Sequence, residues 1–262
     1  MQPQIELNSA HPSRSKWPLS VVIGLGTLLV FAARCPADTV FSDGTFNNAD
    51  WSVVSEGIGN GGTASGSQAT SGGNPGDYRQ VSLTVNSAPG GSQPYSVEIA
   101  AHLNSTAIYA PAVQGAIGSL DISQDAILLQ GSGDGIGEGI ALQQDGQTFY
   151  SADNLGHGLF ITPDHTWTNH QMPGMTAADF FTAADWPYAT AGAKPDFSAS
   201  GDLITLGFYT SGVTNNGSYT VSGGVDNWSL TVHSVPEPTG GCALAVGTLA
   251  FFGRRCREGM NP

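Results

Sequence analysis

The sequence predicts an all-β fold, an antiparallel, jelly-roll-like β-sandwich with one short helix. Glycine accounts for 36 of the 262 residues, about twice the usual share of roughly 7%, and indicates many turns. Short stretches of alternating apolar and polar residues are common, whereas helical periodicity is scarce. Many short strands separated by Gly- and Asn-rich turns are typical of a sandwich or a barrel.

The alternation places the strands in a central body, residues 38–234. Val81, Leu83 and Val85, for example, share one face of a predicted strand. Residues 57–77 are rich in Gly and Ser and hold almost no large apolar residue, so we expect a long surface loop there. The predicted strands are Thr39–Asp43, Trp51–Val54, Tyr78–Val85, Tyr95–Ala101, Ala116–Ile122, Ala126–Gln130, Gly139–Gln143, Gln147–Ser151, Gly158–Thr162, Leu203–Thr210, Ser218–Val221 and Asn227–His233.

One short helical segment is expected between residues 176 and 185. Thr176 and Asp179 have the spacing of a capping box, with Asp in place of the usual Glu, and Thr182 and Asp185 repeat it. Two phenylalanines lie between the motifs. We expect one or two helical turns packed over a sheet edge.

The two ends of the body are expected to pair. Near the end, Asp226-Asn227 follows two glycines, and Trp228, Leu230 and Val232 alternate inward. With Phe41-Ser42-Asp43 near the start, this layout resembles the first-with-last strand pairing of jelly-roll carbohydrate modules of the concanavalin-A-like and galactose-binding-like families. The resemblance rests on the two ends of the body and implies a carbohydrate-binding scaffold.

Residues 1–37 have the layout of a secretory signal peptide. Arg14 and Lys16 precede an apolar run over residues 17–33, and Cys35-Pro36-Ala37 offers small residues to a signal peptidase. We expect a signal helix and cleavage before Asp38, with an uncleaved N-terminal anchor as the alternative.

Residues 235–262 combine three unlike pieces in a fixed order. A Pro-Glu-Pro triplet, which favours an extended chain, precedes an apolar run and then a cluster of arginines. This layout resembles the PEP-CTERM sorting signal of bacterial envelope proteins, which implies a membrane helix and processing by a membrane-embedded exosortase. The apolar run, residues 240–253, has 14 residues, fewer than the roughly 20 that span a bilayer, and a plain C-terminal anchor is the alternative. The signal residues are Pro236, Glu237, Pro238, Arg254, Arg255 and Arg257.

The body between these signals is strongly acidic. It holds two basic and 18 acidic side chains, a formal charge of −16, and such a surface repels nucleic acid and anionic polymers. Neutral glycans, cations and cation-bridged anionic glycans remain as partners. The plainer interpretation is that acidity only keeps an exported protein soluble. All three cysteines lie outside the body, which therefore contains no disulfide.

No motif in the body names a reaction. Glycosidases need two carboxylates that face one cleft. Of the candidate pairs, Asp121 with Asp125 is expected to include a turn residue, and Asp134 with Glu138 is expected in a glycine-rich loop. We therefore predict no catalytic residue. Three histidines fall in one segment, His157, His165 and His170. Their spacing matches no recognised set of metal ligands.

Aromatic side chains in or beside loops are the better binding candidates. Sugar rings stack on flat aromatic faces, and Trp167, Trp186 and Tyr188 have many polar neighbours. The alternative is that these rings fill the core, as large aromatic side chains usually do. Arg79, the only arginine of the body, is expected to form a buried fork to a carboxylate.

A structural Ca²⁺ is predicted where the two ends of the body meet. Ca²⁺ takes about six to eight oxygen ligands from carboxylates, amides and carbonyls. Asp43 and Asp226 supply carboxylates at the first and last strands, and Asn227 adds an amide oxygen. Acidic turn residues without any ion are the alternative.

These features together predict an exported, non-enzymatic protein of the cell envelope, outer surface or extracellular matrix of a Gram-negative-type bacterium, with extracellular polysaccharide as the candidate ligand. The alternative is a carbohydrate-active hydrolase or lyase on a concanavalin-A-like scaffold. A pocket with two carboxylates roughly 5–10 Å apart would favour the enzyme, whereas a flat or convex face with aromatic platforms would favour binding.

Overall fold

The computed structural model describes residues 38–91, 94–131, 135–152, 159–160, 165–186 and 192–235. The predicted signal helix and the sorting segment from Pro236 onward lie outside these ranges. In the part of the chain that is described, no helix is long and apolar enough to cross a bilayer.

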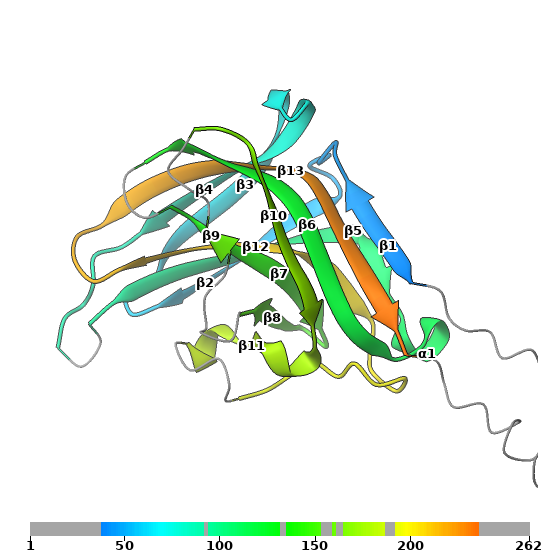
Figure 1. Ribbon diagram of the computed structural model, residues 1–262. Coiled ribbons are helices and arrows are strands. Elements are labelled where there is room, and N and C mark those ends of the chain that lie inside the picture. Colours follow the sequence, from blue (N-terminus) through cyan, green and yellow to red (C-terminus); the bar gives the residue numbers. More distant parts are fainter. Residues whose placement is uncertain are drawn as a thin grey trace, which may run out of the picture. The chain divides into compact units, whose positions relative to one another are not determined.

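Two antiparallel sheets make up the body, as the sequence predicts (Figure 1). Sheet A consists, in order, of β10 (Thr168–Met175), β6 (Ile117–Gln130), β13 (Tyr219–Ser234), β4 (Gly76–Val85) and β3 (Gly62–Gly73), and β1 (Thr39–Asp43) also pairs with β13. Sheet B consists of β11 (Phe180–Phe181), β8 (Gln147–Ser151), β7 (Gly137–Gln144), β12 (Ile204–Thr214), β5 (Ser96–Tyr109) and β2 (Trp51–Ile58), and β9 (Leu159–Phe160) pairs with β7. The short helical elements are α1 (Pro111–Gln114), η1 (Ala177–Asp179) and η2 (Ala183–Asp185).

The main hydrophobic core lies between the two sheets. Leu120 of β6 and Leu230 of β13 belong to the same buried cluster as Ile140 of β7 and Phe208 of β12. In β6, the core residues Leu120, Ile122, Ala126 and Leu128 occupy alternate positions, because successive side chains point to opposite faces of a sheet. The alternation therefore fixes which side chains remain on the outer face of each sheet.

The first and last strands pair, as predicted. β1 runs antiparallel to β13, with Thr39 opposite Val232 and Asp43 opposite Trp228. The Trp228 ring is fully buried and meets the ring of Trp51 edge-on, with 5.2 Å between the ring centroids. This pairing joins the start of the body to its end through backbone hydrogen bonds.

The predicted surface loop over residues 57–77 is wrong, because most of it forms β3 and the start of β4. The inward positions of β3 need small residues. A Cβ on Gly66 would lie 2.8 Å from the ring of His102 and 2.9 Å from Nη2 of Arg79. The absence of large apolar residues therefore reflects how closely β3 approaches buried polar side chains beneath it.

Two predicted strand breaks are also wrong, since β6 and β13 each run through a predicted gap. The gap in β6 contains Gln124, which is polar but fully buried. The gap in β13 contains Gly224, where a Cβ would lie 2.9 Å from the ring of Trp167. β10 was not predicted as a strand, because Pro173 and Gly174 interrupt its pattern and its pairing with β6 shifts register between Met172 and Met175.

The two predicted helical turns are present as η1 and η2. The carboxylate of Asp179 accepts hydrogen bonds from the N–H and the hydroxyl of Thr176, at 2.8 and 2.7 Å. Asp185 accepts the same pair from Thr182, at 3.3 and 2.7 Å. The two phenylalanines between the turns form β11, which pairs with β8 at the edge of sheet B.

Candidate functional site

The outer face of sheet A, which points away from the core, carries a band of polar side chains. The strand register places Gln171 of β10 beside Ser123 of β6, and Ser123 beside Ser229 of β13. In the next row, Asp121 lies beside Thr231. Polar groups from three strands, distant in the sequence, therefore lie together on one face.

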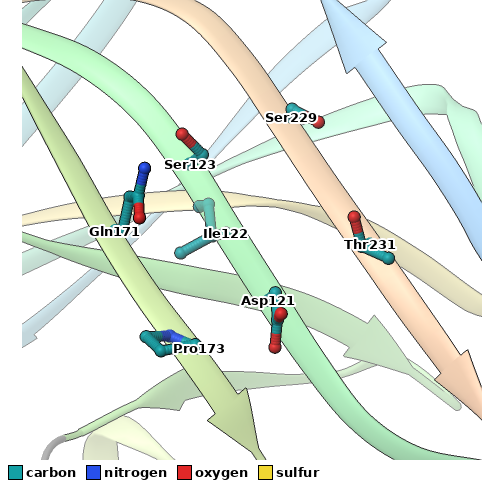
Figure 2. Close-up of a pocket in the computed structure, with 7 residues that line it drawn as sticks. All are labelled: Asp121, Ile122, Ser123, Gln171, Pro173, Ser229 and Thr231. Carbon is teal, nitrogen blue, oxygen red and sulfur yellow. The ribbon is translucent and has the colours of Figure 1, made fainter.

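These side chains line an open groove across β10, β6 and β13, with a volume of about 230 Å³ (Figure 2). Asp121 is the only carboxylate in the lining, and no lining residue carries a positive charge. The lining residues are Asp121, Ile122, Ser123, Gln171, Pro173, Ser229 and Thr231.

The groove has unused hydrogen-bonding capacity. Gln171 donates through Nε2 to Oδ1 of Asn169 at 3.0 Å, which leaves its carbonyl oxygen as an acceptor. The hydroxyl of Ser123 accepts from Nδ2 of Asn169 at 3.3 Å. Ser229 and Thr231 are half-buried, and in the described part of the chain neither hydroxyl has a protein partner.

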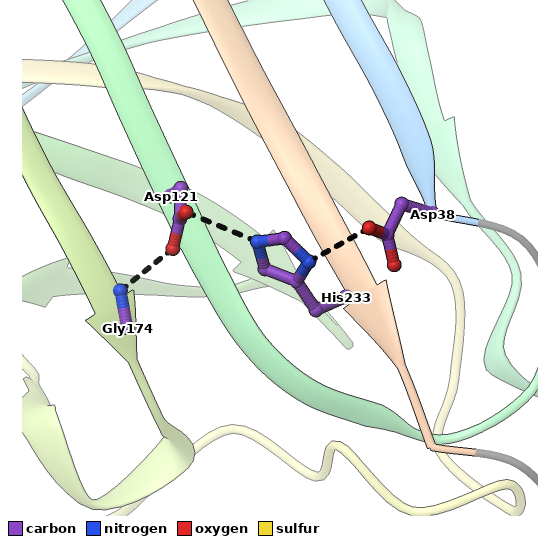
Figure 3. A network of polar contacts seen from close by, with 4 residues as sticks. All are labelled: Asp38, Asp121, Gly174 and His233. Atoms are coloured by element: carbon purple, nitrogen blue, oxygen red, sulfur yellow. Dashed lines mark hydrogen bonds and ion pairs between the residues drawn. The ribbon is translucent and has the colours of Figure 1, made fainter.

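Asp121 is fixed at one end of the groove by two donors (Figure 3). Its Oδ1 accepts a hydrogen bond from the N–H of Gly174 at 2.6 Å, and its Oδ2 lies 3.0 Å from Nε2 of His233. Nδ1 of His233 lies 3.0 Å from Oδ2 of Asp38, the first residue of the body. The imidazole thus bridges two carboxylates.

This bridge favours the charged forms of Asp121 and His233. Burial acts to raise the pKa of Asp121, but the hydrogen bonds from Gly174 and His233 outweigh it and lower that pKa overall. The hydrogen bond to Asp121, with a weaker one to Asp38, raises the pKa of His233. The bridge is complete while His233 is protonated and is lost as the pH rises through this raised pKa.

Beyond the groove, the same face holds a second polar cluster. Asp125 and Asp226 lie directly opposite each other on β6 and β13. Asp125 accepts hydrogen bonds from the side-chain amides of Asn227, Asn74 and Asn169, at 2.8, 3.1 and 2.9 Å. Asp226 accepts from the backbone N–H groups of Asn227 and Asn74. The donors on both carboxylates are amides, with no basic residue among them.

The three predicted Ca²⁺ ligands fall into two separate contacts. Asp226 and Asn227 belong to the cluster above, which also contains Asp125, a residue that the sequence did not single out as a ligand. Asp43 instead accepts hydrogen bonds within its own turn and, at 2.7 Å, from the indole N–H of Trp51. Among the residues that the structure describes, no three His, Cys, Asp or Glu side chains form a metal-binding group.

The predicted aromatic residues lie on different faces. Trp167 is half-buried on the outer face of sheet A, where its Nε1 donates to the carbonyl of Gly72 at 3.1 Å and its ring meets Tyr78 edge-on. Trp186 packs on Phe181 in a second hydrophobic cluster on the outer side of sheet B. Tyr188 lies outside the described residues. Trp167 is thus the predicted aromatic residue on the face that holds the groove.

Arg79 does not form the predicted fork to a carboxylate. It is buried between the sheets, where its Nε donates to Nδ1 of His102 at 3.5 Å and its guanidinium lies over the ring of Trp51. Burial lowers the pKa of Arg79 to about 10. Burial, together with the charge of Arg79, lowers the pKa of His102 to about 3, so the ring is neutral and can accept this hydrogen bond.

The carboxylate pairs considered for catalysis do not share a cleft. Asp121 and Asp125 both point outward from β6, four residues apart, so their Cα atoms are about 13 Å apart along the strand. The predicted turn at Asp125 is wrong, because it lies inside β6. Glu138 lies in β7, not in a loop, and is fully buried against Gln124 between the sheets. Asp134 is outside the described residues.

The sequence missed the groove because it missed β10. Ser229 and Thr231 were recognisable as outward positions of a predicted strand, and Ser123 could have been assigned similarly. Their partner Gln171 lies in a segment with Pro173 and three histidines nearby in the sequence, where no strand alternation is visible. The site depends on a strand order that a single sequence does not reveal.

Comparisons with known proteins give structural neighbours only. No protein-family model and no curated protein matches the chain. The CBM22-1 xylan-binding domain of Paenibacillus barcinonensis Xyn10C is 10% identical over 76% of this chain and 97% of its own, with a TM-score of 0.37. The CBM22-1–CBM22-2 tandem domain of the same protein is 11% identical over 80% and 50%, with a TM-score of 0.40. TmCBM61, solved with β-1,4-galactotriose, is 9% identical over 72% and 92%, with a TM-score of 0.31. Likeness at this level assigns no ligand to the chain.

Proposed function

We propose that the body binds an uncharged polysaccharide on the outer face of sheet A and does so without catalysis. The groove across β10, β6 and β13 carries the proposal. Its hydroxyl groups, from Ser123, Ser229 and Thr231, can both donate and accept hydrogen bonds, and Asp121 and Gln171 add acceptors. A chain of sugar hydroxyls complements such a surface, because each hydroxyl can also donate and accept.

The charge of this surface disfavours acidic polymers. The groove lining includes one carboxylate and no basic residue, and the whole body has a formal charge of −16. His233, beside the groove, is already held between Asp121 and Asp38. A carboxylated or sulfated polymer would therefore lose hydration at this face without a cationic partner in the groove lining. An uncharged polysaccharide avoids that cost.

Binding without hydrolysis fits the positions of the carboxylates. A glycosidase needs two carboxyl groups roughly 5–10 Å apart that face one cleft. Asp38, which His233 joins to Asp121, lies outside the groove lining, where Asp121 is the sole carboxylate. The alternative, a hydrolase or lyase, predicts that a bound oligosaccharide is shortened on prolonged incubation with the protein. Chromatography of the recovered ligand distinguishes the two.

The binding proposal is tested with the full chain, purified in mild detergent, on an array of neutral and acidic polysaccharides. Neutral polysaccharides should bind and acidic ones should not. Thr231→Val and Gln171→Ala each remove a polar group from the groove and should weaken binding about tenfold, the effect of losing 1.4 kcal/mol. Ser82→Ala, on β4 of the same sheet and outside the groove lining, is the matched control. Absence of neutral ligands, or an equal loss in the control, would refute the proposal.

We further propose that the protein is exported to the cell envelope, outer surface or matrix and is sorted there by exosortase. The supporting features are the signal layout of residues 1–37 and the Pro236-Glu237-Pro238 triplet with its apolar run and arginines. The N–H of Val235, the residue before the triplet, donates to the carbonyl of Ala116 at 2.8 Å.

Sorting is tested by the mass of the C-terminus in the native host. Glu237→Ala should leave an unprocessed precursor in the membrane, because the triplet is the proposed recognition feature. Identical processing of wild type and variant would leave a plain membrane anchor as the explanation.

A further inference from the structure

We propose that the polysaccharide site extends from the groove along β10, β6 and β13 to Trp167, so that the ligand is an extended chain lying along the strands. This inference rests on the proposed function and specifies its ligand. It excludes a single sugar or a short chain end as the preferred ligand, because neither would reach both the groove and the indole ring.

The outward side chains form consecutive rows between these two points. Asp121 and Ile127 are six residues apart on β6, about 20 Å along an extended strand. Starting from the groove, the rows are Asp121 and Thr231, then Gln171, Ser123 and Ser229, then Asn169, Asp125 and Asp226, and finally Ile127 and Gly224. Pro173 lines the groove with Asp121, and Trp167, the residue before β10, lies against Gly224. We name this set the polar strip.

Trp167 closes the far end of the polar strip. Trp167 directly precedes β10, and its ring reaches Gly224 of β13, where a Cβ would lie 2.9 Å from the indole. Ile127, between them on β6, is 8% exposed. Gly72 and Tyr78 hold the ring from the side. An indole that is half-buried on a polar face offers its remaining surface to the apolar side of a sugar ring.

The middle of the polar strip is ordered before any ligand arrives. Asn169 is exposed, and its Nδ2 lies within hydrogen-bonding distance of Ser123 Oγ and of Asp125 Oδ1, at 3.3 and 2.9 Å. Its Oδ1 accepts from Gln171. Side chains that are already fixed lose little conformational entropy on binding, so the contacts they add contribute more fully to affinity.

The charge of the polar strip specifies an uncharged chain along its whole length. Asp121, Asp125 and Asp226 are its charged groups, and no arginine or lysine belongs to its rows. Asp125 and Asp226 are buried, at 9% and 1% exposure, so Asp121 is the carboxylate that can hold a sugar hydroxyl, and all three would repel a uronic acid.

The test is calorimetry of the full chain with matched neutral sugars, cellobiose and cellohexaose, xylobiose and xylohexaose, and mannobiose and mannohexaose. In at least one series, the hexaose should bind at least about tenfold more tightly than the disaccharide. Trp167→Ala should abolish most of this difference and leave the affinity for the disaccharide unchanged. Trp186→Ala, which removes a half-buried tryptophan from the opposite sheet, is the control and should change neither affinity.

A second pair of variants covers the case in which Trp167→Ala disturbs the fold, which a thermal melt would reveal. Gly224→Ala places a methyl group against the indole and against the ring of Tyr78 that holds it, so it should displace the indole and weaken hexaose binding in the same way. Trp167→Tyr should retain most of the gain. Equal affinities for disaccharide and hexaose in every series would overturn the extended strip but leave the groove as the binding site. No binding of any of these sugars to wild type would overturn the proposed function itself.

Discussion

Glu138 and Gln124 link the two sheets through an uncharged pair. Gln124 donates through Nε2 to Oε2 of Glu138 at 2.6 Å, and both side chains are fully buried. Burial raises the pKa of Glu138 to about 8, although the hydrogen bond from Gln124 lowers it. The Oε1 atoms of both residues lack a partner in the described part of the chain. A protonated carboxyl supplies the hydrogen that these two acceptors need.

This pair predicts that stability falls as the pH rises. The unfolded chain releases the Glu138 proton near pH 4.5, whereas the folded chain keeps it until about pH 8. Between these values the folded state binds one more proton, so the free energy of unfolding decreases by at most about 1.4 kcal/mol per pH unit. Glu138→Gln cannot ionise and retains an amide pair, so it should flatten this slope. Denaturant melts of both proteins from about pH 5 to about pH 9 measure the slope, and equal slopes would contradict the assignment.

At the scale of single residues, the sequence predicted which side chains are buried better than it predicted their hydrogen-bond partners. The alternation alone placed Trp228, Leu230 and Val232 inside the core, where the structure has them. The contact between Arg79 and His102 was not predictable, because it joins β4 of sheet A to β5 of sheet B. Such a contact depends on how the two sheets are aligned, and the alternation within one strand carries no information about that.

At the scale of elements, the sequence predicted the strands whose inward side chains are apolar. It did not predict β3 and β10, whose sequences are mostly small or polar. β3 has glycine and alanine at inward positions because Arg79 and His102 fill the space beneath it. β10 contains Pro173, which an edge strand tolerates since its N–H can face solvent. Both strands have sequences that otherwise indicate loops, and both are recognisable only from what packs beside them.

The last strand is predicted to hold the sandwich together through Trp228. Its ring is fully buried and contacts Trp51, which in turn packs against Phe46 and Phe208. Trp228→Ala should lower the free energy of unfolding by about 3–5 kcal/mol, because the cavity lies between two packed sheets. Leu203→Ala, at a side chain that is 63% exposed, should change it little. A denaturant melt in which both variants match wild type would mean that the closing strand contributes little to the core.

The predicted Ca²⁺ site depends on side chains that lie where the first and last strands pair. Asp226 and Asn227 lie with Asp125 and Asn74 in one cluster of carboxylate and amide groups, which are ligand types that Ca²⁺ takes. We expect Ca²⁺ at 100 times its dissociation constant to stabilise the protein by about 2.7 kcal/mol. Asp226→Asn should abolish this gain, whereas Asp43→Asn should reduce it only if Asp43 turns toward the ion. Coincident melts of wild type with Ca²⁺ and with chelator would show that the protein binds no stabilising Ca²⁺.

At the scale of the whole body, composition predicted the fold class but not the site. Abundant glycine, scarce helical periodicity and short alternating stretches sufficed for a β-sandwich with paired ends. The groove needs β10, β6 and β13 side by side in sheet A, and these strands come from three distant parts of the chain. Their order follows from how the strands are connected, which the residue pattern of each strand leaves open.

Amide hydrogen exchange, read peptide by peptide with and without the tightest-binding neutral polysaccharide, locates the binding face on one of the two sheets. Binding on the outer face of sheet A predicts slower exchange in peptides that cover β10, β6 and β13, with the largest change around Ser123, Gln171 and Thr231. Peptides from β2, β5 and β12 of sheet B should exchange at the same rate in both samples. Protection confined to sheet B, around Tyr150, Tyr209 and Trp186, would contradict binding on sheet A and place the binding face on the opposite side of the sandwich.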